Sequence, residues 1–333
     1  MAYAHIIGTG AWLPQRILTN EDLELIVETS DEWITRRTGI KERRIARKSA
    51  NECTSDLGTR AARLALEKAD ISPDQIDTII VATVTADHLF PSAACMIQKE
   101  LAAKNAAAYD LSAGCSGFIY GLETANNAIR IGQADIILVI GVERLSSVVN
   151  WKDRGTCVLL GDGAGAAVLQ GQQKNGGILS THIKSDGSLW DLLHSVEGND
   201  SQPESLNDLA IKPYILTMEG NRLFKRAVSR MTRIAERALE KNGLNRDDIQ
   251  LVVPHQANLR IIQAVSEKLK IPMDKFYTNL QKYGNTSSAS IPIALDEAHR
   301  NGRLADGDRI LLVSFGAGLT WGACIIQWTT RGS

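Results

Sequence analysis

The sequence has only five cysteines, and no two of them stand at the spacing of a metal site or a disulfide framework. They are Cys53, Cys95, Cys115, Cys157 and Cys324, an odd number without a CxxC motif. The sequence also lacks any apolar run near the roughly 20 residues that cross a bilayer. Its first residues lack the basic flank of a signal peptide. We therefore expect a cytoplasmic protein in a reducing compartment, with no metal site.

An excess of charge of either sign is also missing. The chain has 333 residues, 37 Lys and Arg against 38 Asp and Glu, a net charge of -1 and 44% hydrophobic residues. This composition is typical of a globular protein with one large domain or two coupled halves, and it does not point to nucleic acid.

The sequence has glycine-rich stretches but no complete dinucleotide-binding motif. In IIGTGAWL (6–13) Leu13 occupies the place of the third glycine, and GDGAGAAVL (161–169) runs into a predicted strand rather than a helix. We interpret both as tight turns and close packing, which argues against a nicotinamide-dependent dehydrogenase.

Short apolar runs alternate with segments of helical period, which predicts an α/β fold with largely parallel sheets covered by helices. Strands are expected at 4–8, 76–83, 106–111, 136–143, 163–170, 177–185, 249–254, near 276–279, 309–314 and 321–328. Helices are expected at 53–69, 92–101, 116–131, 218–242, 257–268 and 286–299, and a polar loop at 197–208.

The element order repeats, which predicts a duplication with halves at 1–175 and 176–333. ALEKADISPDQIDTIIVA (65–82) resembles ALEKNGLNRDDIQLVVPH (238–255) in sequence and in predicted structure. In this register Cys115 opens the third helix of the first half, and Asn285 opens the matching helix of the second. His255 ends a strand. Chemistry collects at the carboxyl ends of parallel strands, so we expect the three residues to meet near a pseudo-twofold axis.

These residue types suit nucleophilic catalysis. A helix N-terminus is expected to lower the pKa of the Cys115 thiol, and Gly114 and Gly117 would let a substrate approach the sulfur. His255 can hydrogen-bond an oxyanion or exchange a proton, and Asn285 offers an uncharged donor. The alternatives are structural: a small buried cysteine, a satisfied histidine and an asparagine in a helix cap. The other four cysteines are interpreted as core residues.

The predicted helix at 218–242 carries one row of basic residues at spacings of three and four. This row is either a solvated face, with Glu236 and Glu240 as counterions, or a docking surface for an acidic or phosphate-bearing partner. Its members are Arg226, Arg230, Arg233, Arg237 and Lys241, with Lys225 beside them.

Eight motifs across essentially the whole chain resemble the β-ketoacyl-[acyl-carrier-protein] synthase III family, the initiating condensing enzymes of bacterial fatty acid synthesis. They are TSDEWITRRTGIKERRIA (29–46), FPSAAC (90–95), DLSAGCSGF (110–118), DRGTCVLLGDGAGAAVL (153–169), MEGNRLFK (218–225), VPHQANLRII (253–262), YGNTSSASIPIAL (283–295) and SFGAGLTWG (314–322). The resemblance implies a thiolase-like duplicated fold with five αβαβα layers, in which a pseudo-twofold axis relates two mixed sheets.

The resemblance also implies a reaction, the decarboxylating condensation of an acyl-CoA primer, first of all acetyl-CoA, with malonyl-[acyl-carrier-protein]. Cys115 would carry the acyl group as a thioester. His255 and Asn285 would bind the malonyl thioester carbonyl and stabilise the enolate. The backbone N–H groups of Cys115 and Ala317 would form the other oxyanion hole. The family often has glycine at position 317.

The family's binding residues carry over by motif, and they imply a homodimer without a resident cofactor, since acyl-CoA is a substrate. Coenzyme A would contact Thr29, Trp33, Arg37 and Arg154, with the adenine between Trp33 and Arg154. Gly220, Phe224, Ala257 and Asn258 would line the pantetheine tunnel. Leu145, Leu160, Leu216 and Phe315 would line the acyl pocket, with Phe90 reaching into the partner subunit's pocket. Lys225, Arg260 and Lys268 would dock the carrier protein, although Glu267 interrupts the family's usual lysine pair.

Several alternatives remain. A thiolase would need a second cysteine in SFGAG, and elongating condensing enzymes would need histidine in place of Asn285. A sister condensing enzyme of secondary metabolism would keep all three residues. A thiol hydrolase would also use a Cys/His/Asn set, whereas a scaffold protein would not need the thiol.

Overall fold

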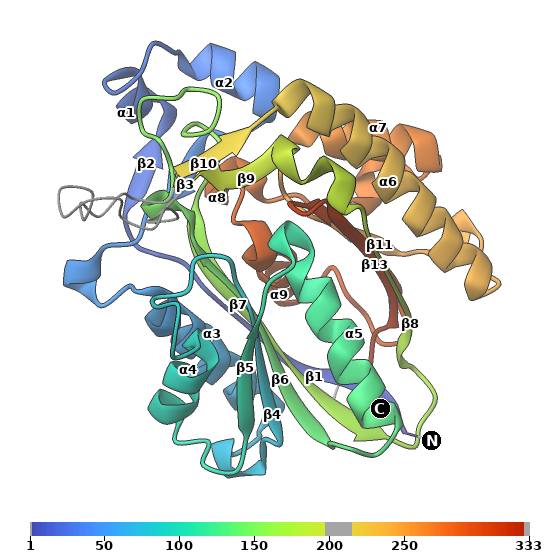
Figure 1. Ribbon diagram of the computed structural model, residues 1–333. Coiled ribbons are helices and arrows are strands. Elements are labelled where there is room, and N and C mark those ends of the chain that lie inside the picture. Colours follow the sequence, from blue (N-terminus) through green and yellow to red (C-terminus); the bar gives the residue numbers. More distant parts are fainter. Residues whose placement is uncertain (1, 197–214, 330–333) are drawn as a thin grey trace.

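Two mixed β-sheets form the framework of the protein, as the computed structural model of residues 2–196 and 215–329 shows (Figure 1). The first sheet has the order β1 (Tyr3–Trp12), β7 (Asp162–Gln172), β6 (Ile136–Arg144), β4 (Thr78–Ala82) and β5 (Ala107–Leu111). The second has the order β11 (Leu251–Pro254), β12 (Arg309–Gly316), β13 (Thr320–Gln327) and β8 (Gly177–Ser185). Only β4, β5 and β6 of the first sheet and β11 and β12 of the second run parallel. The other pairs are antiparallel, so the largely parallel sheets expected from the element order are wrong and the mixed sheets implied by the resemblance are confirmed.

Helices cover both faces of each sheet, so the layers follow the order αβαβα (Figure 1). α3 (Thr54–Ala69) and α4 (Ala93–Leu101) cover the outer face of the first sheet, and α6 (Gly220–Lys241) and α7 (Leu259–Leu269) cover that of the second. α5 (Gly117–Arg130) and α9 (Ser290–Arg300) lie between the sheets. Strand alternation explains this layering, because Ile79 and Val81 pack outward while Ile80 packs inward.

The two sheets repeat one topology, as the duplication predicts. The order β4-β6-β7-β1 of the first sheet matches β11-β12-β13-β8 of the second. Phe276 bridges Val252 in parallel, in the place that β5 holds beside β4. The boundary at residues 175 and 176 stays a prediction.

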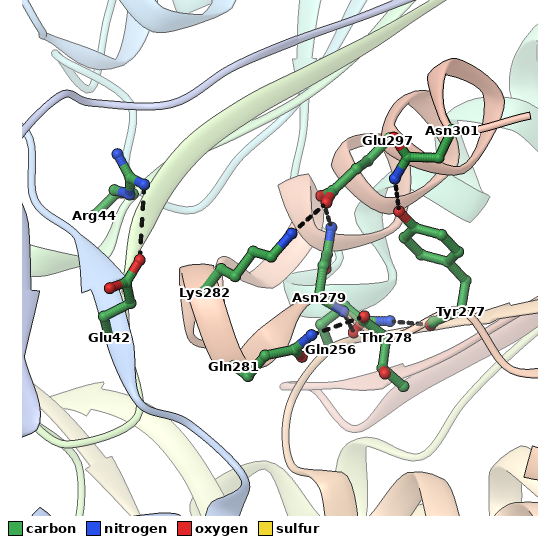
Figure 2. A network of polar contacts seen from close by, with 10 residues as sticks. All are labelled: Glu42, Arg44, Gln256, Tyr277, Thr278, Asn279, Gln281, Lys282, Glu297 and Asn301. Atoms are coloured by element: carbon green, nitrogen blue, oxygen red, sulfur yellow. Dashed lines mark hydrogen bonds and ion pairs between the residues drawn. The ribbon is translucent and has the colours of Figure 1, made fainter.

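The strand expected near 276–279 is wrong, because it is reduced to that single bridge and followed at once by α8 (Leu280–Tyr283). The side chain of Gln256 forms hydrogen bonds with backbone groups that a longer strand would use for pairing (Figure 2). Its Nε2 donates to Tyr277 O at 3.1 Å, and its Oε1 accepts from Asn279 N–H at 3.0 Å.

Short elements missing from the sequence-based prediction cover the ends of the sheets. They are β2 (Ile17–Thr19), α1 (Asn20–Glu24), α2 (Asp31–Thr38), β3 (Glu42–Arg44), β9 (Leu193–Val196) and β10 (Ile215–Met218), together with one-turn helices such as η3 (Gly114–Ser116) and η9 (Ser287–Ala289). The fully buried Arg43 joins part of this region by donating to Leu18 O, Asn20 Oδ1 and Val158 O. The loop expected at 197–208 lies outside the described residues. Within the ranges described, no helix is long and apolar enough to cross a membrane.

Candidate active site

Cys115 lies in η3, the one-turn helix between β5 and α5. Two glycines let this turn approach the loop after β12. Gly114 has a left-handed φ of +53°, and a Cβ on it would collide with the backbone of Ala317. A Cβ on Gly316 would collide with the backbone of Cys115. The SAGCSG and SFGAG motifs therefore meet because both are glycine-rich at the contact.

The thiol of Cys115 is not activated in the way the sequence predicts. Burial raises its pKa to about 11, and an ionised carboxylate at the nearby Glu143 would act in the same direction. Hydrogen bonds from Ser287 and from the N–H groups of Cys115 and Ala317 act in the opposite direction. The expected lowering is wrong because desolvation of the thiolate outweighs the helix terminus. The two N–H groups nevertheless converge on the sulfur, where an oxyanion hole is expected.

His255 follows the last residue of β11, and its ring is buried at 4% exposure. Burial lowers its pKa to about 3, so the imidazole is neutral at pH 7. Its Nδ1 lies 2.7 Å from Ser290 Oγ, which also accepts from Gln256 N–H at 3.4 Å. Since that hydroxyl already accepts a bond, we assign its proton to Nδ1. The Nε2 of His255 then carries the ring proton and is a donor.

Asn285 lies just before α9 and is held by its backbone and its side chain. Its N–H donates to Leu159 O at 2.8 Å, and its carbonyl accepts from Gly161 N–H at 3.0 Å. Its Oδ1 accepts from Ser287 N–H at 2.8 Å. This bond orients the amide, and the NH₂ group remains as a donor at the cavity that Asn285 lines.

Cys115 and Asn285 line the same cavity, of about 70 Å³. Ala317 and three of the predicted acyl-pocket leucines line it as well. The complete lining is Val84, Gly114, Cys115, Leu145, Thr156, Leu159, Leu160, Leu193, Leu216, Met218, Asn285, Ser287 and Ala317. Two predicted pocket residues lie elsewhere: Phe90 is 85% exposed, and Phe315 packs in the core beside α6 and α7.

The predicted coenzyme A residues form a second cluster. The guanidinium carbons of Arg37 and Arg154 lie 4.8 and 5.2 Å from the centroid of the Trp33 ring. Arg154 also donates to Glu28 O at 2.9 Å, next to Thr29. A flat aromatic ring with two guanidinium groups suits a purine and its phosphates.

The predicted tunnel residues connect this cluster to the docking residues. Asn258 caps α7, and its Nδ2 donates to Arg37 O at 3.2 Å. The Arg260 guanidinium lies 5.7 Å from the Phe224 ring centroid. Gly220 is the first residue of α6, and Ala257 precedes the Asn258 cap.

One face of α6 carries a basic groove of about 430 Å³. It is lined by Arg222, Lys225, Arg226, Ser229, Arg230 and Arg233, called the α6 groove below. Arg230 also lies 3.6 Å from Asp186 and 4.8 Å from the Trp321 ring centroid. The rest of the predicted basic row, Arg237 and Lys241, does not line the groove, and neither do Arg260 and Lys268 on α7.

Sequence reasoning missed three polar residues around the site. Ser287 and Ser290 orient Asn285 and His255, and Glu143 lies behind the nucleophile. The serine run in YGNTSSAS is a signal of the first two. The place of Glu143 in an otherwise apolar strand, IILVIGVER, is a signal of the third.

Comparisons with known proteins agree on one family. Family profiles described as 3-oxoacyl-[acyl-carrier-protein] synthase III match residues 109–187, and its C-terminal profile matches 239–328. The β-ketoacyl-[acyl-carrier-protein] synthase III of Caldanaerobacter subterraneus subsp. tengcongensis is 52% identical over 98% of both chains. That of Clostridium acetobutylicum is 49% identical over 99% of this chain and all of its own.

Solved structures give the same result. The 3-oxoacyl-[acyl-carrier-protein] synthase III of Aquifex aeolicus has a TM-score of 0.90 and 49% identity over 98% of this chain and 100% of its own. The priming β-ketosynthase of the R1128 polyketide pathway has a TM-score of 0.92 and 35% identity, covering 98% and 97%. The fold is thus the thiolase-like fold that the motifs imply. The chain belongs to the β-ketoacyl-[acyl-carrier-protein] synthase III family of acyltransferases, the condensing enzymes that initiate fatty acid synthesis.

Proposed function

We propose that the protein condenses acetyl-CoA with malonyl-[acyl-carrier-protein] through an acyl-Cys115 thioester. The observation that carries this proposal is the cavity that Cys115 and Asn285 share, with Ala317 in its wall. The sulfur attacks the acetyl thioester carbonyl, and the N–H groups of Cys115 and Ala317 stabilise the oxyanion. Coenzyme A then leaves with the thiol proton, and the acetyl group stays on Cys115.

In the second half-reaction, His255 Nε2–H and the Asn285 NH₂ donate to the malonyl thioester carbonyl. The malonyl carboxylate leaves as carbon dioxide, and its bonding electrons form an enolate between the two donors. The enolate carbon attacks the acetyl-Cys115 carbonyl, which forms the carbon–carbon bond and releases the Cys115 sulfur as a thiolate that takes up a proton from solvent. Both donors are neutral, which suits a charge that appears and disappears within one cycle. No resident cofactor is needed for these steps.

For substrate binding we propose the residues that the motifs imply. The Trp33 cluster would hold the adenine end of coenzyme A, with Arg154 moving aside to stack on it. Gly220, Phe224, Ala257 and Asn258 would line the pantetheine path. The α6 groove with Arg260 and Lys268 would bind the acidic carrier protein by charge complementarity.

We also propose a homodimer in the cytoplasm. Val84, Leu89, Phe90 and Tyr109 are exposed by 47%, 88%, 85% and 39%, near the edge strand β5, and such an apolar surface suits an interface. Phe90 would cross this interface to the partner subunit's acyl pocket. The five cysteines are all free thiols, which suits a reducing compartment.

Mass spectrometry tests the function directly. Incubation with acetyl-CoA should add one acetyl group to Cys115, and malonyl-[acyl-carrier-protein] should then remove it as acetoacetyl-[acyl-carrier-protein]. An adduct that survives Cys115→Ala, or release of free acetate without a condensation product, would contradict the proposal. The second outcome would identify a thiol hydrolase.

A priming ketosynthase of a specialised pathway is the second candidate, because the R1128 enzyme shares 35% identity and the same fold. A panel of acyl-CoA primers separates the two. Acetyl-CoA is the expected preference here, and a clear preference for longer or branched primers favours the specialised role.

A further inference from the structure

Glu143 is a buried carboxyl next to the nucleophile. It lies near the end of β6 with 0% exposure. The ion pairs of the described ranges, residues 2–196 and 215–329, do not include it. An isolated carboxylate is expensive to bury, so its surroundings indicate its protonation state.

One carboxyl oxygen of Glu143, Oε2, accepts hydrogen bonds from three donors. Oε2 accepts from Thr83 Oγ1 at 3.2 Å, from Val84 N–H at 3.1 Å and from Thr85 Oγ1 at 2.6 Å. These three donors belong to the loop that follows β4. Both hydroxyls already accept a backbone N–H, Thr83 from Thr85 and Thr85 from Arg144, so we assign their protons to Glu143 Oε2. A proton on Glu143 must therefore sit on Oε1.

The other oxygen faces a hydroxyl that has two neighbouring oxygens. Ser288 Oγ lies 3.0 Å from Glu143 Oε1 and 2.8 Å from Ala82 O. A serine has one proton, so it cannot donate fully to both. If Oε1 carries a proton, it donates to Ser288 Oγ, and Ser288 donates to Ala82 O. Every group is then satisfied.

Asp162 is a buried carboxyl on the neighbouring strand, and donors contact both of its oxygens. It accepts from Ala46 N–H at 2.7 Å and from Ser146 N–H and Oγ at 2.9 and 2.6 Å. All of these partners are donors, which suits an ionised carboxylate. Asp162 is therefore a matched control for Glu143.

We propose that Glu143 is a positioning residue held as a neutral carboxylic acid, which anchors the η9 turn through Ser288 and keeps negative charge away from Cys115. The η9 turn follows Asn285 and contains Ser287, whose N–H orients the Asn285 amide. The proposal rests on Cys115 being the nucleophile.

The electrostatic surroundings support this assignment. Burial is the largest influence on the carboxyl and raises the pKa of Glu143, against the hydrogen bonds from Thr85, Val84, Ser288 and Ser287. The titratable groups on the elements around it are Cys115 on η3, Arg144 on its own strand, Asp162 on β7, Asp87 after β4 and the neutral His255 beyond β11.

The pH profile of Cys115 alkylation by iodoacetamide tests the proposal. Glu143→Gln keeps the size of a neutral acid, so the apparent pKa of the thiol should stay as in the wild type, measured by mass on the Cys115 peptide. If Glu143 is ionised, the variant removes a neighbouring charge. Alkylation at a fixed pH below the thiol pKa then rises, by about tenfold for each unit, and the proposal is overturned.

Stability and turnover give a second comparison. Glu143→Gln should melt near the wild type and retain condensation within about threefold. Asp162→Asn should melt clearly lower, because its NH₂ must face a backbone N–H donor at either position, Ser146 N–H at Oδ1 or Ala46 N–H at Oδ2. Loss of condensation in a folded Glu143→Gln protein would mean that the charge of Glu143 is required, and it would refute the neutral acid.

Infrared spectroscopy tests the protonation state of Glu143 in the wild-type protein, so the result does not depend on whether a variant folds. With ¹³C-labelled glutamate at pH 8, a protonated carboxyl stretch should shift with the label, which excludes Asp162 as its source. Absence of that labelled band overturns the proposal. The infrared band does not depend on turnover. If Cys115 is not the nucleophile, the Cys115→Ala variant will still catalyse condensation, and that result is separate from the infrared result.

Discussion

Asn285→Asp is the substitution that most directly tests whether the two half-reactions use different hydrogen-bond donors. Aspartate keeps the size of the side chain and the oxygen that accepts from Ser287 N–H at 2.8 Å. It replaces only the NH₂ donor, and it places a carboxylate where the enolate forms. Losing one donor to an oxyanion typically costs 10²–10³-fold in rate, about 2.7–4 kcal/mol. The new charge opposes the enolate as well, so we expect decarboxylation to fall by about 10³-fold or more.

Acylation of Cys115 should fall by less than about tenfold in the same variant, because that step uses the N–H groups of Cys115 and Ala317. Acetyl transfer is followed by the mass of the protein, and decarboxylation by labelled carbon dioxide from malonyl-[acyl-carrier-protein]. Asn301→Asp is a matched control, since Asn301 donates to Tyr277 OH at 2.9 Å, outside the site (Figure 2). Equal losses in the two half-reactions, or an equal effect of Asn301→Asp, would refute the reasoning.

Three further predictions concern the same machinery. Because burial lowers the pKa of His255 from 6.5 to about 3, the unfolded chain binds a proton in that window and the folded chain does not. Its contribution to stability is full above pH 6.5 and is lost as the pH falls, by up to about 1.4 kcal/mol per unit; denaturant titrations should show a weaker dependence for His255→Gln. Ser290→Ala should impair decarboxylation more than acylation, because the variant removes the hydroxyl that donates to Nδ1 and so sets the ring tautomer. Ser266 is another buried serine, and Ser266→Ala should impair neither step. Lys225→Glu should raise KM for the carrier protein several-fold, with a smaller effect at high salt, whereas Arg237→Glu outside the α6 groove should have little effect.

Each of these predictions has a result that contradicts it. An equal pH dependence of stability in His255→Gln would mean that another group titrates. Equal losses in Ser290→Ala and Ser266→Ala would reduce Ser290 to a packing role, and ¹⁵N chemical shifts of the His255 ring would report the tautomer directly. A change in KM for acetyl-CoA with Lys225→Glu would assign that residue to the other substrate.

The sequence by itself determined the alternation of strands and helices and the duplication, because both depend on local periodicity, whereas the five-layer order followed from the resemblance to a known family. The continuous apolar runs in 136–143 and 309–314 predict buried strands, and both are strands in the structure. The repeated ALEK segments predict two equivalent units, and the matching strand orders agree. Where a side chain replaces backbone pairing the local pattern fails, as at 276–279, where Gln256 bonds Tyr277 and Asn279.

The tertiary structure alone decided the electrostatics of the site. A helix start favours a thiolate, but desolvation depends on what covers the sulfur, and in this fold it raises the pKa of Cys115 to about 11. The bond from Ser290 to His255 depends on the start of α9 meeting the end of β11, whereas the bond from Ser287 to Asn285 is local to one turn. Glu143 lies on β6, which β4 separates from the strand that leads to Cys115, and no sequence motif connects the two positions. Residue types and periodicity are local properties, whereas burial and proton sharing arise only when distant segments pack together.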